Sequence, residues 1–179
     1  MTEATLRPWR PSDAFALVQA RNASEDLDAQ FGGTVFTDVG AAERFIADSL
    51  VFEGHARNWA VDVDGEAVGN IGLSAIEYRN DTAWTYYWLA APVRGCGIAG
   101  AGLRAVAGWA FTAGLHRLEL GHRTNNPASC RVATAAGFVP EGVERDKLRY
   151  GDERFDVELH ARLRTDPSPA GKRLPLKSR

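Results

Sequence analysis

The sequence of 179 residues predicts one α/β domain, built on a mixed, mostly antiparallel central sheet with helices on both faces. Two observations carry this prediction. Between residues 58 and 89 the apolar side chains alternate with a period of two, which is typical of an antiparallel meander. From residue 93 onward a glycine turn, a helix and a strand follow one another, which places helices against the sheet.

Composition excludes several classes of protein. Hydrophobic residues make up 45% and charged residues 25% of the chain, which suffices for one core. A net charge of −2 gives no general attraction to nucleic acid or to an anionic membrane. No apolar run approaches the roughly 20 residues that span a bilayer. The first residues lack the apolar core of a signal peptide, so we expect a cytoplasmic protein.

Before the meander, the sequence gives only short helix and strand signals. Ser12 and Asp13 offer N-cap oxygens to a helix, whereas residues 25–40 are polar and show no period. The elements expected here are a strand at Leu6–Trp9, a helix at Ala14–Ala20 and a helix at Ala41–Phe52.

The meander itself has three strands. Trp59–Val63 and Ala67–Glu77 flank Asp64-Gly65, and an Asp-Gly pair between apolar runs is a strong hairpin signal. A further turn precedes the strand Trp84–Leu89, and Pro92 ends the meander.

The second half alternates helices and strands. Leu103, Val106 and Ala110 mark the buried face of a helix at Ile98–Ala113. Asn126 is the expected N-cap of the next helix, with proline after it and Gly137 at its end. The expected strands are Leu115–His122, Phe138–Val139 and Phe155–Leu163. We place the domain at residues 1–164 and expect disorder in the proline-containing, basic tail 165–179.

The turn between residues 93 and 100 carries the chemistry. Its glycines let a ligand approach the backbone closely, and the first N–H groups of the following helix have no partner within the helix. Those donors and the positive end of the helix dipole form an anion site suited to a pyrophosphate.

A dinucleotide site is an alternative interpretation of this turn. Gly95, Gly97 and Gly100 have the spacing of the dinucleotide fingerprint, and Glu119 follows about twenty residues later. The turn nevertheless follows an antiparallel meander, and the sequence shows only one strand–helix–strand unit. Glu119 also lies inside a predicted strand and not at its end, which disfavours a ribose ligand.

Six short motifs, in order, resemble the GNAT superfamily of N-acetyltransferases. Arg94–Ala99 is similar to its acetyl-CoA signature, Arg/Gln-x-x-Gly-x-Gly/Ala, and the wider pattern resembles the branch with the ribosomal-protein N-terminal acetyltransferases RimJ and RimL. The pieces are Tyr87-Trp88-Leu89, Arg94-Gly95-Cys96-Gly97, Ala110-Phe111, Asn126-Pro127-Ala128-Ser129, Ala136-Gly137-Phe138 and Glu141-Gly142. Asp156 and the opening Leu6–Ala14 also fit.

The resemblance implies the acyl-CoA fold in which two central strands splay apart. Pantetheine would pair with the backbone of Trp88, Leu89 and Ala90, and Asn126 would contact the pantetheine arm or orient the site. The residues implied for the pyrophosphate are Arg94, Gly95, Cys96, Gly97, Ile98 and Ala99. Ser129 is the implied acid that protonates the departing thiolate. Alternatively, Ser129 satisfies a free N–H in the first turn of its helix.

The chemistry needs an oxyanion donor and a base. A backbone N–H of Leu89 or Ala90 can hold the oxyanion. Relatives often carry an acid where this chain has Trp84, or about nineteen residues after the serine, where Leu148 stands. The remaining candidates for a base are Glu77, Glu119, His122, Glu144 and Asp146, and the sequence does not decide between them.

The absence of an acid at the two positions where relatives carry one affects which acceptor amine we expect. At pH 7 about a tenth of an α-amine is neutral, compared with about one lysine amine in 2,500. A weak base therefore favours a peptide N-terminus or a small amine of low pKa. An acyl-CoA sensor without turnover is the alternative function. Basic residues of the tail suggest docking to the ribosome or nucleic acid, although a solvated tail explains them equally.

Histidine spacing shows no HxxxH or HExxH pattern, so we predict no metal. Cys96 and Cys130 are expected to be small packed residues without a disulfide. The sequence leaves the oligomeric state open, a homodimer included.

Overall fold

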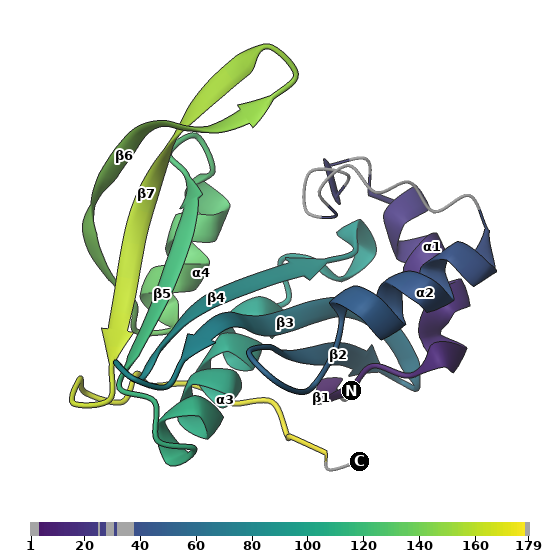
Figure 1. Cartoon of the computed structure of the whole chain (residues 1–179), viewed down its shortest axis with the longest axis horizontal. Helices are drawn as coiled ribbons and strands as arrows, with labels where there is room; N and C mark the ends of the chain where they lie inside the picture. Colours follow the sequence, from purple (N-terminus) through teal and green to yellow (C-terminus); the bar gives the residue numbers. More distant parts are fainter. Residues whose placement is uncertain (1–3, 25, 28–30, 32–37, 178–179) are drawn as a thin grey trace.

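A seven-stranded sheet with the strand order β1-β2-β3-β4-β5-β7-β6 forms the frame of the protein (Figure 1). The computed structural model describes residues 4–24, 26, 27, 31 and 38–177. Most of the stretch 25–37, for which the sequence gives no period, therefore lies outside the described residues. No helix in the described ranges is long and apolar enough to cross a membrane.

The first half follows the predicted order. β1 (Ala4–Pro8) leads through a short 3-10 turn to α1 (Ala14–Asn22), and α2 (Val39–Ser49) comes next. One predicted detail is wrong: the side chain of Asp13 does not cap α1. Its carboxylate instead accepts hydrogen bonds from the Arg7 guanidinium and from the Arg10 N–H.

The predicted meander is confirmed. β2 (Arg57–Val63), β3 (Glu66–Glu77) and β4 (Thr82–Leu89) pair antiparallel in sequence order. Asp64 and Gly65 both have positive φ, at 53° and 92°, as a type I′ hairpin turn requires. Side chains of β4 alternate between the two cores, with Trp88 in one cluster and Leu89 in the other.

The second half contains one strand that the sequence pattern does not predict in full. α3 (Ile98–Thr112), β5 (Arg117–Arg123) and α4 (Pro127–Ala135) lie close to their predicted positions. β6 (Val139–Tyr150), however, extends eleven residues beyond its predicted end and pairs with β7 (Glu153–Leu163). Because most β6 side chains are exposed, the strand carries no alternating apolar signal.

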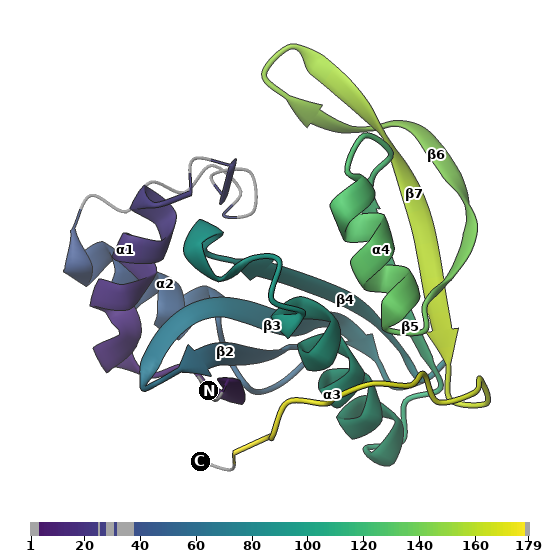
Figure 2. The same ribbon diagram turned by 180° about the vertical axis from the view of Figure 1, so that it is seen from behind.

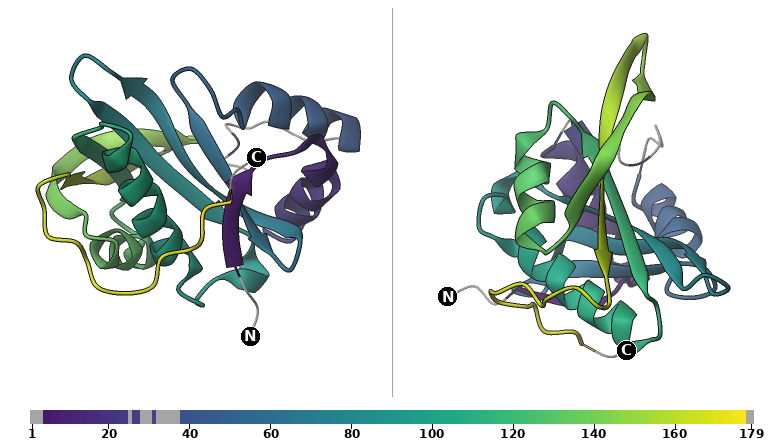
Figure 3. Two further views of the ribbon diagram at one scale, coloured as in Figure 1. Left: turned by 90° about the horizontal axis from the view of Figure 1, so that it is seen from below. Right: turned by 90° about the vertical axis from the view of Figure 1, so that its left-hand side faces the viewer.

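Helices cover both faces of the sheet, as predicted. α3 and α4 contribute to one hydrophobic cluster together with β1–β5, and α1 and α2 contribute to a second cluster on the opposite face. Figure 3 shows α1 and α2 on the side away from α3, and the β6–β7 hairpin projecting beyond the body of the protein.

The expectation of a disordered tail is wrong for residues 165–177. This segment runs along α3 and reaches the free edge of β1 (Figure 2). There Leu6 N–H donates to the Pro175 carbonyl at 2.8 Å, and Lys177 N–H donates to the Leu6 carbonyl at 2.7 Å. Leu174 is buried at 5% exposure. One buried leucine and backbone pairing to an edge strand order the segment, neither of which composition reveals.

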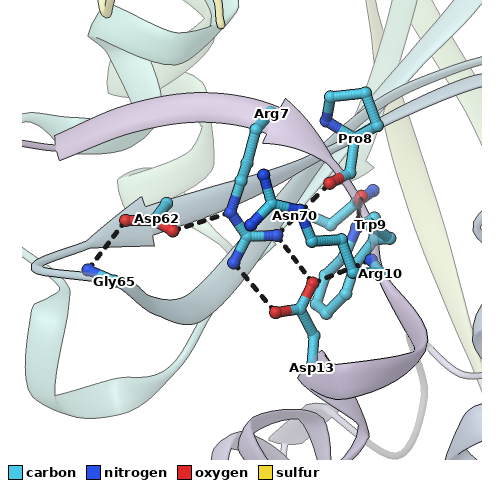
Figure 4. A network of polar contacts seen from close by, with 8 residues as sticks. All are labelled: Arg7, Pro8, Trp9, Arg10, Asp13, Asp62, Gly65 and Asn70. Carbon is cyan, nitrogen blue, oxygen red and sulfur yellow. Dashed lines mark hydrogen bonds and ion pairs between the residues drawn. The ribbon is translucent and has the colours of Figure 1, made fainter. Parts of the chain in front are cut away.

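A buried ion-pair network joins β1, α1 and β2 (Figure 4). Arg7 donates to both carboxylate oxygens of Asp13, at 2.6 and 2.8 Å, and to Asp62 at 2.7 Å. Burial alone would raise the pKa of the Asp62 carboxyl. Hydrogen bonds from Arg7 and from the Gly65 N–H outweigh burial, so that pKa lies below its ordinary value.

We expect Arg7→Met to lower the free energy of unfolding by about 3–5 kcal/mol at pH 7, because two buried carboxylates lose their partner. The Asp62 contribution is present above its unfolded pKa of about 3.9 and is lost as the pH falls through its lower folded value. Urea unfolding of both proteins at several pH values should therefore show a gap that narrows below about pH 4. The exposed Arg79→Met control should change stability by less than about 0.5 kcal/mol. An equal loss in both variants would contradict this account.

Candidate functional site

The central feature of the site is a fork between two strands. β4 and β5 pair in parallel only at Thr82–Arg117, Ala83–Leu118 and Trp84–Glu119. Beyond these pairs, β4 continues to residue 89 and β5 to residue 123 without partnering each other, and the ribbons diverge (Figure 2). The splayed strands expected from the resemblance are therefore present.

The register of β3 against β4 decides which backbone groups face the gap. Ala90 N–H donates to the Val68 carbonyl at 2.8 Å, so this pair is hydrogen-bonded. Because hydrogen-bonded and non-hydrogen-bonded pairs alternate, the neighbouring Gly69–Leu89 pair points the Leu89 N–H and carbonyl away from β3, into the gap. By the same alternation, the N–H and carbonyl of Tyr87 face the gap, and those of Trp88 face β3. The Ala90 N–H is therefore not available as an oxyanion donor, whereas the Leu89 N–H faces the gap.

A cleft of about 610 Å³ opens beside this fork, lined by residues of β4, α3 and α4. Of the eleven predicted site residues, nine line it: Trp88, Leu89, Arg94, Gly95, Gly97, Ile98, Ala99, Asn126 and Ser129. Two do not. Ala90 lies against β3, and Cys96 is exposed, with its thiol 3.7 Å from the Arg94 carbonyl. The expectation that Cys96 packs in the protein is wrong.

The glycine turn suits a ligand that approaches the backbone. Gly95 and Gly97 have φ of 79° and 76°, a region that favours glycine, and a Cβ added at either would meet no atom within 4 Å. The first hydrogen bond of α3 runs from Ala101 N–H to the Gly97 carbonyl. The N–H groups of residues 98–100 therefore have no acceptor within the helix, at its positive end. This open cradle fits a pyrophosphate.

Arg94 ties the glycine turn to the strand that precedes it. Its Nε donates to the Leu89 carbonyl at 2.8 Å, and its guanidinium pairs with Asp26 at 3.0 Å. The side chain therefore fixes the end of β4. Sequence reasoning missed other cationic lining residues, Arg104 and Arg131. Arg104 donates to the carbonyls of Lys172 and Ala135, so it joins the C-terminal segment to α4.

Ser129 reaches across the gap from α4 to β4. Its hydroxyl lies 2.7 Å from the hydroxyl of Tyr87. As predicted, Asn126 caps α4: its side-chain oxygen accepts from the Ser129 N–H at 3.1 Å. Asn126 thus fixes the backbone of Ser129, and the Ser129 hydroxyl points toward β4. The hydroxyl contacts Tyr87, and the side-chain cap of α4 comes from Asn126, which disfavours the alternative interpretation of Ser129 as a capping residue.

Tyr87 is the polar residue that sequence reasoning did not assign to the site. Burial raises the pKa of its hydroxyl, and the hydrogen bond with Ser129 offsets this only in part. The phenol therefore stays protonated at neutral pH and can donate to Ser129. Tyr87 belongs to the motif Tyr87-Trp88-Leu89, but it lies 42 residues from Ser129 in the sequence, so no local pattern predicts their contact.

None of the five candidate bases lines the cleft among the described residues. Glu77 accepts from two N–H groups of the β3–β4 turn. Glu119 and Glu144 pair with Arg117 and Lys147. The backbone of Asp146 donates to Asp156 within the β6–β7 hairpin. The fifth candidate, His122, lies on the diverging end of β5, where its Nε2 is 3.0 Å from His160 Nε2.

Comparisons with known proteins agree with this geometry. Residues 3–139 match the family model for the acetyltransferase (GNAT) domain. The ribosomal-protein-serine acetyltransferase of Escherichia coli is 33% identical over 111 residues, which cover 62% of each chain. The chain thus matches less than two thirds of that relative's length.

Solved structures share the fold. Mycobacterium smegmatis RimJ in complex with CoA-disulfide has a TM-score of 0.78 at 26% identity, with 90% of this chain and 85% of that chain covered. The ribosomal-protein-S5-alanine acetyltransferase of Vibrio fischeri has a TM-score of 0.80 at 19% identity, with 94% and 100% covered. A family match over most of the chain, a forked sheet and an open glycine cradle lead to one conclusion: the chain belongs to the GNAT acetyltransferase family.

Proposed function

We propose that the protein is an N-acetyltransferase that transfers acetyl from acetyl-CoA to a primary amine, with a protein or peptide N-terminal α-amine as the acceptor. The fork between β4 and β5, with the glycine cradle at its side, carries this proposal. A cytoplasmic location belongs to the same proposal, because proteins are made and modified at their N-termini there.

The N–H groups at the start of α3 bind the pyrophosphate of the coenzyme, and Gly95 and Gly97 leave room for it. The outward edge of β4 then offers the backbone of Tyr87 and the Leu89 carbonyl to the pantetheine amides, as an added strand would use them, and leaves the Leu89 N–H for the thioester. Trp88 lines the cleft, but its N–H and carbonyl face β3, so the pairing of its backbone with pantetheine that the resemblance implied does not fit this register.

Two groups act on the thioester. The Leu89 N–H, directed into the gap, stabilises negative charge on the carbonyl oxygen as the amine attacks. Ser129 donates its proton to the departing thiolate and is reprotonated through Tyr87, by way of their 2.7 Å contact, with the proton that the attacking amine releases to water. Because a thiol has a pKa near 8.5, the thiolate leaves readily and this acid has a modest task.

The α-amine acceptor follows from the placement of the acids. None of the five candidate bases lines the cleft, and Asp26, the carboxylate that does so among the described residues, is paired with Arg94, so deprotonation of a lysine amine would lack help. An α-amine with a pKa of about 8 supplies its own neutral fraction. The Escherichia coli relative named as a ribosomal-protein-serine acetyltransferase supports the same class of acceptor.

We expect Gly97→Glu to weaken acetyl-CoA binding far more than Gly97→Gln. Both variants strain a residue with φ of 76°, but only the carboxylate repels the pyrophosphate. Isothermal titration calorimetry should show at least about a tenfold difference in Kd, decreasing with added salt. Equal affinities would place the pyrophosphate elsewhere.

We expect Ser129→Ala to lower kcat by about 10- to 100-fold, at the low end for general acid catalysis because the leaving group is good. Tyr87→Phe should lower kcat less, and the double variant should fall by less than the product of the two single effects. The KM for acetyl-CoA should change little. Exposed Tyr78→Phe is the matched control, with unchanged kinetics. A wild-type kcat in Ser129→Ala would remove Ser129 from the mechanism.

Acceptor choice can be measured by thiol release with three peptides of one sequence: one with a free N-terminus and no lysine, one N-acetylated with lysine, and one N-acetylated without lysine. We expect turnover only with the first, with a rate that rises with pH up to about 8 as the α-amine becomes neutral. Turnover with the lysine peptide alone would contradict the α-amine proposal. Tight acetyl-CoA binding without turnover across N-terminal sequences, polyamines and amino acids would favour a sensor.

A further inference from the structure

Four side chains with metal-binding atoms converge beneath the first turn of α4. They are His122 on β5, Cys130 on α4, and Glu158 and His160 on β7, and one ligand atom of each lies within 4.8 Å of all the others. Because they come from three separate elements, no spacing in the sequence predicts the cluster. His122 pairs directly with Glu158 across the antiparallel strands, and His160 follows two residues later on the same face.

Backbone carbonyls orient both imidazoles toward one point. His122 Nδ1 lies 3.0 Å from the Arg123 carbonyl, and His160 Nδ1 lies 3.5 Å from the Phe138 carbonyl. A carbonyl only accepts, so each Nδ1 carries the proton and each neutral ring leaves Nε2 bare. Metal-bound histidines are held in this way, with Nδ1–H on a backbone carbonyl and Nε2 toward the ion.

The bare nitrogens face each other. His122 Nε2 and His160 Nε2 are 3.0 Å apart, and Glu158 Oε2 lies 3.3 and 3.2 Å from them. Both histidines are buried, at 6% and 1% exposure. Three lone pairs converge here, two on buried rings and one on a carboxylate that is 30% exposed, and they repel one another unless a cation lies between them. The choice is between a shared proton and a metal ion.

The set of donors favours a metal. Tetrahedral zinc has bonds of about 2.0–2.1 Å to nitrogen and about 2.3 Å to sulfur, which puts neighbouring ligand atoms roughly 3.3–3.7 Å apart. The nitrogen and oxygen atoms of His122, Glu158 and His160 are 3.0–3.3 Å apart, close to this, and the Cys130 sulfur lies within 4.8 Å of them, so the sulfur must move inward to complete the tetrahedron. Thiolate and imidazole select zinc and its neighbours over Mg²⁺ and Ca²⁺. Two anionic ligands would also leave a buried Zn²⁺ site electrically neutral.

We propose that His122, Cys130, Glu158 and His160 form a tetrahedral site for a divalent transition metal, with Zn²⁺ as the natural occupant. The bound ion joins α4 to β5 and β7. Cys130 follows Ser129 in the chain, so the ion also fixes the turn that directs Ser129 toward Tyr87. Acetyl transfer itself needs no metal in this family, so the role of the ion is structural.

The test uses the full chain, freed of metal with a chelator and titrated with Co²⁺ as a spectroscopic probe. We expect one equivalent to bind, with the intense visible absorption of tetrahedral cobalt and a thiolate-to-cobalt band in the near ultraviolet. Zn²⁺ should displace the cobalt and raise Tm. The weak spectrum of hydrated cobalt in the wild-type protein would overturn the proposal and leave a shared proton.

Variants assign the ligands. Cys130→Ser should remove the thiolate band while keeping most of the side-chain volume, and His160→Gln should weaken Zn²⁺ binding by at least about 100-fold, since even partners behind the ligands cost 10- to 100-fold. Cys96→Ser and His55→Gln are the matched controls and should bind cobalt as the wild type does. Wild-type spectra in Cys130→Ser, or wild-type affinity in a folded His160→Gln, would also overturn it. These readouts do not depend on turnover, so their failure leaves the proposed function untouched.

Discussion

The separation of β4 from β5 is the constraint on which the rest of the site depends. Two neighbouring strands that stop pairing in the middle of a sheet leave polar backbone groups without partners, and such groups are costly unless something else satisfies them. The Arg94 side chain donates a hydrogen bond to the Leu89 carbonyl, and the contact between the Ser129 and Tyr87 hydroxyls links α4 to β4 across the gap. The Leu89 N–H is directed into the same gap. The fork thus leaves a backbone donor open to an extended ligand.

The elements around the fork have complementary tasks. The Arg7 network holds β1, α1 and β2 together on one side of the sheet, and the C-terminal segment covers the outer edge of β1 and the flank of α3. α4 and the β5–β7 strands form the other half, joined to the β1–β4 half within the sheet by three residue pairs of β4 and β5 at the base of the fork.

Sequence reasoning succeeded where one local signal determines the structure. The Asp64-Gly65 turn, the Asn126 cap and the glycine turn before α3 each depend on residues within a few positions, and all three are as predicted. It failed where the cause is distant. β6 has no buried face, residues 165–177 are ordered by pairing with β1, and Asp13 binds Arg7 in place of its own helix. The Tyr87–Ser129 contact and the histidine cluster likewise join separate elements.

Trp84 gives the fork a feature of its own. It is the last residue of β4 to pair with β5, and its ring lies so close to Gly121 that an added Cβ would come within 3.0 Å of it and within 2.9 Å of Val157. The indole therefore acts as a spacer against the bare backbone of β5. A side chain at position 121 would therefore require smaller residues at both 84 and 157.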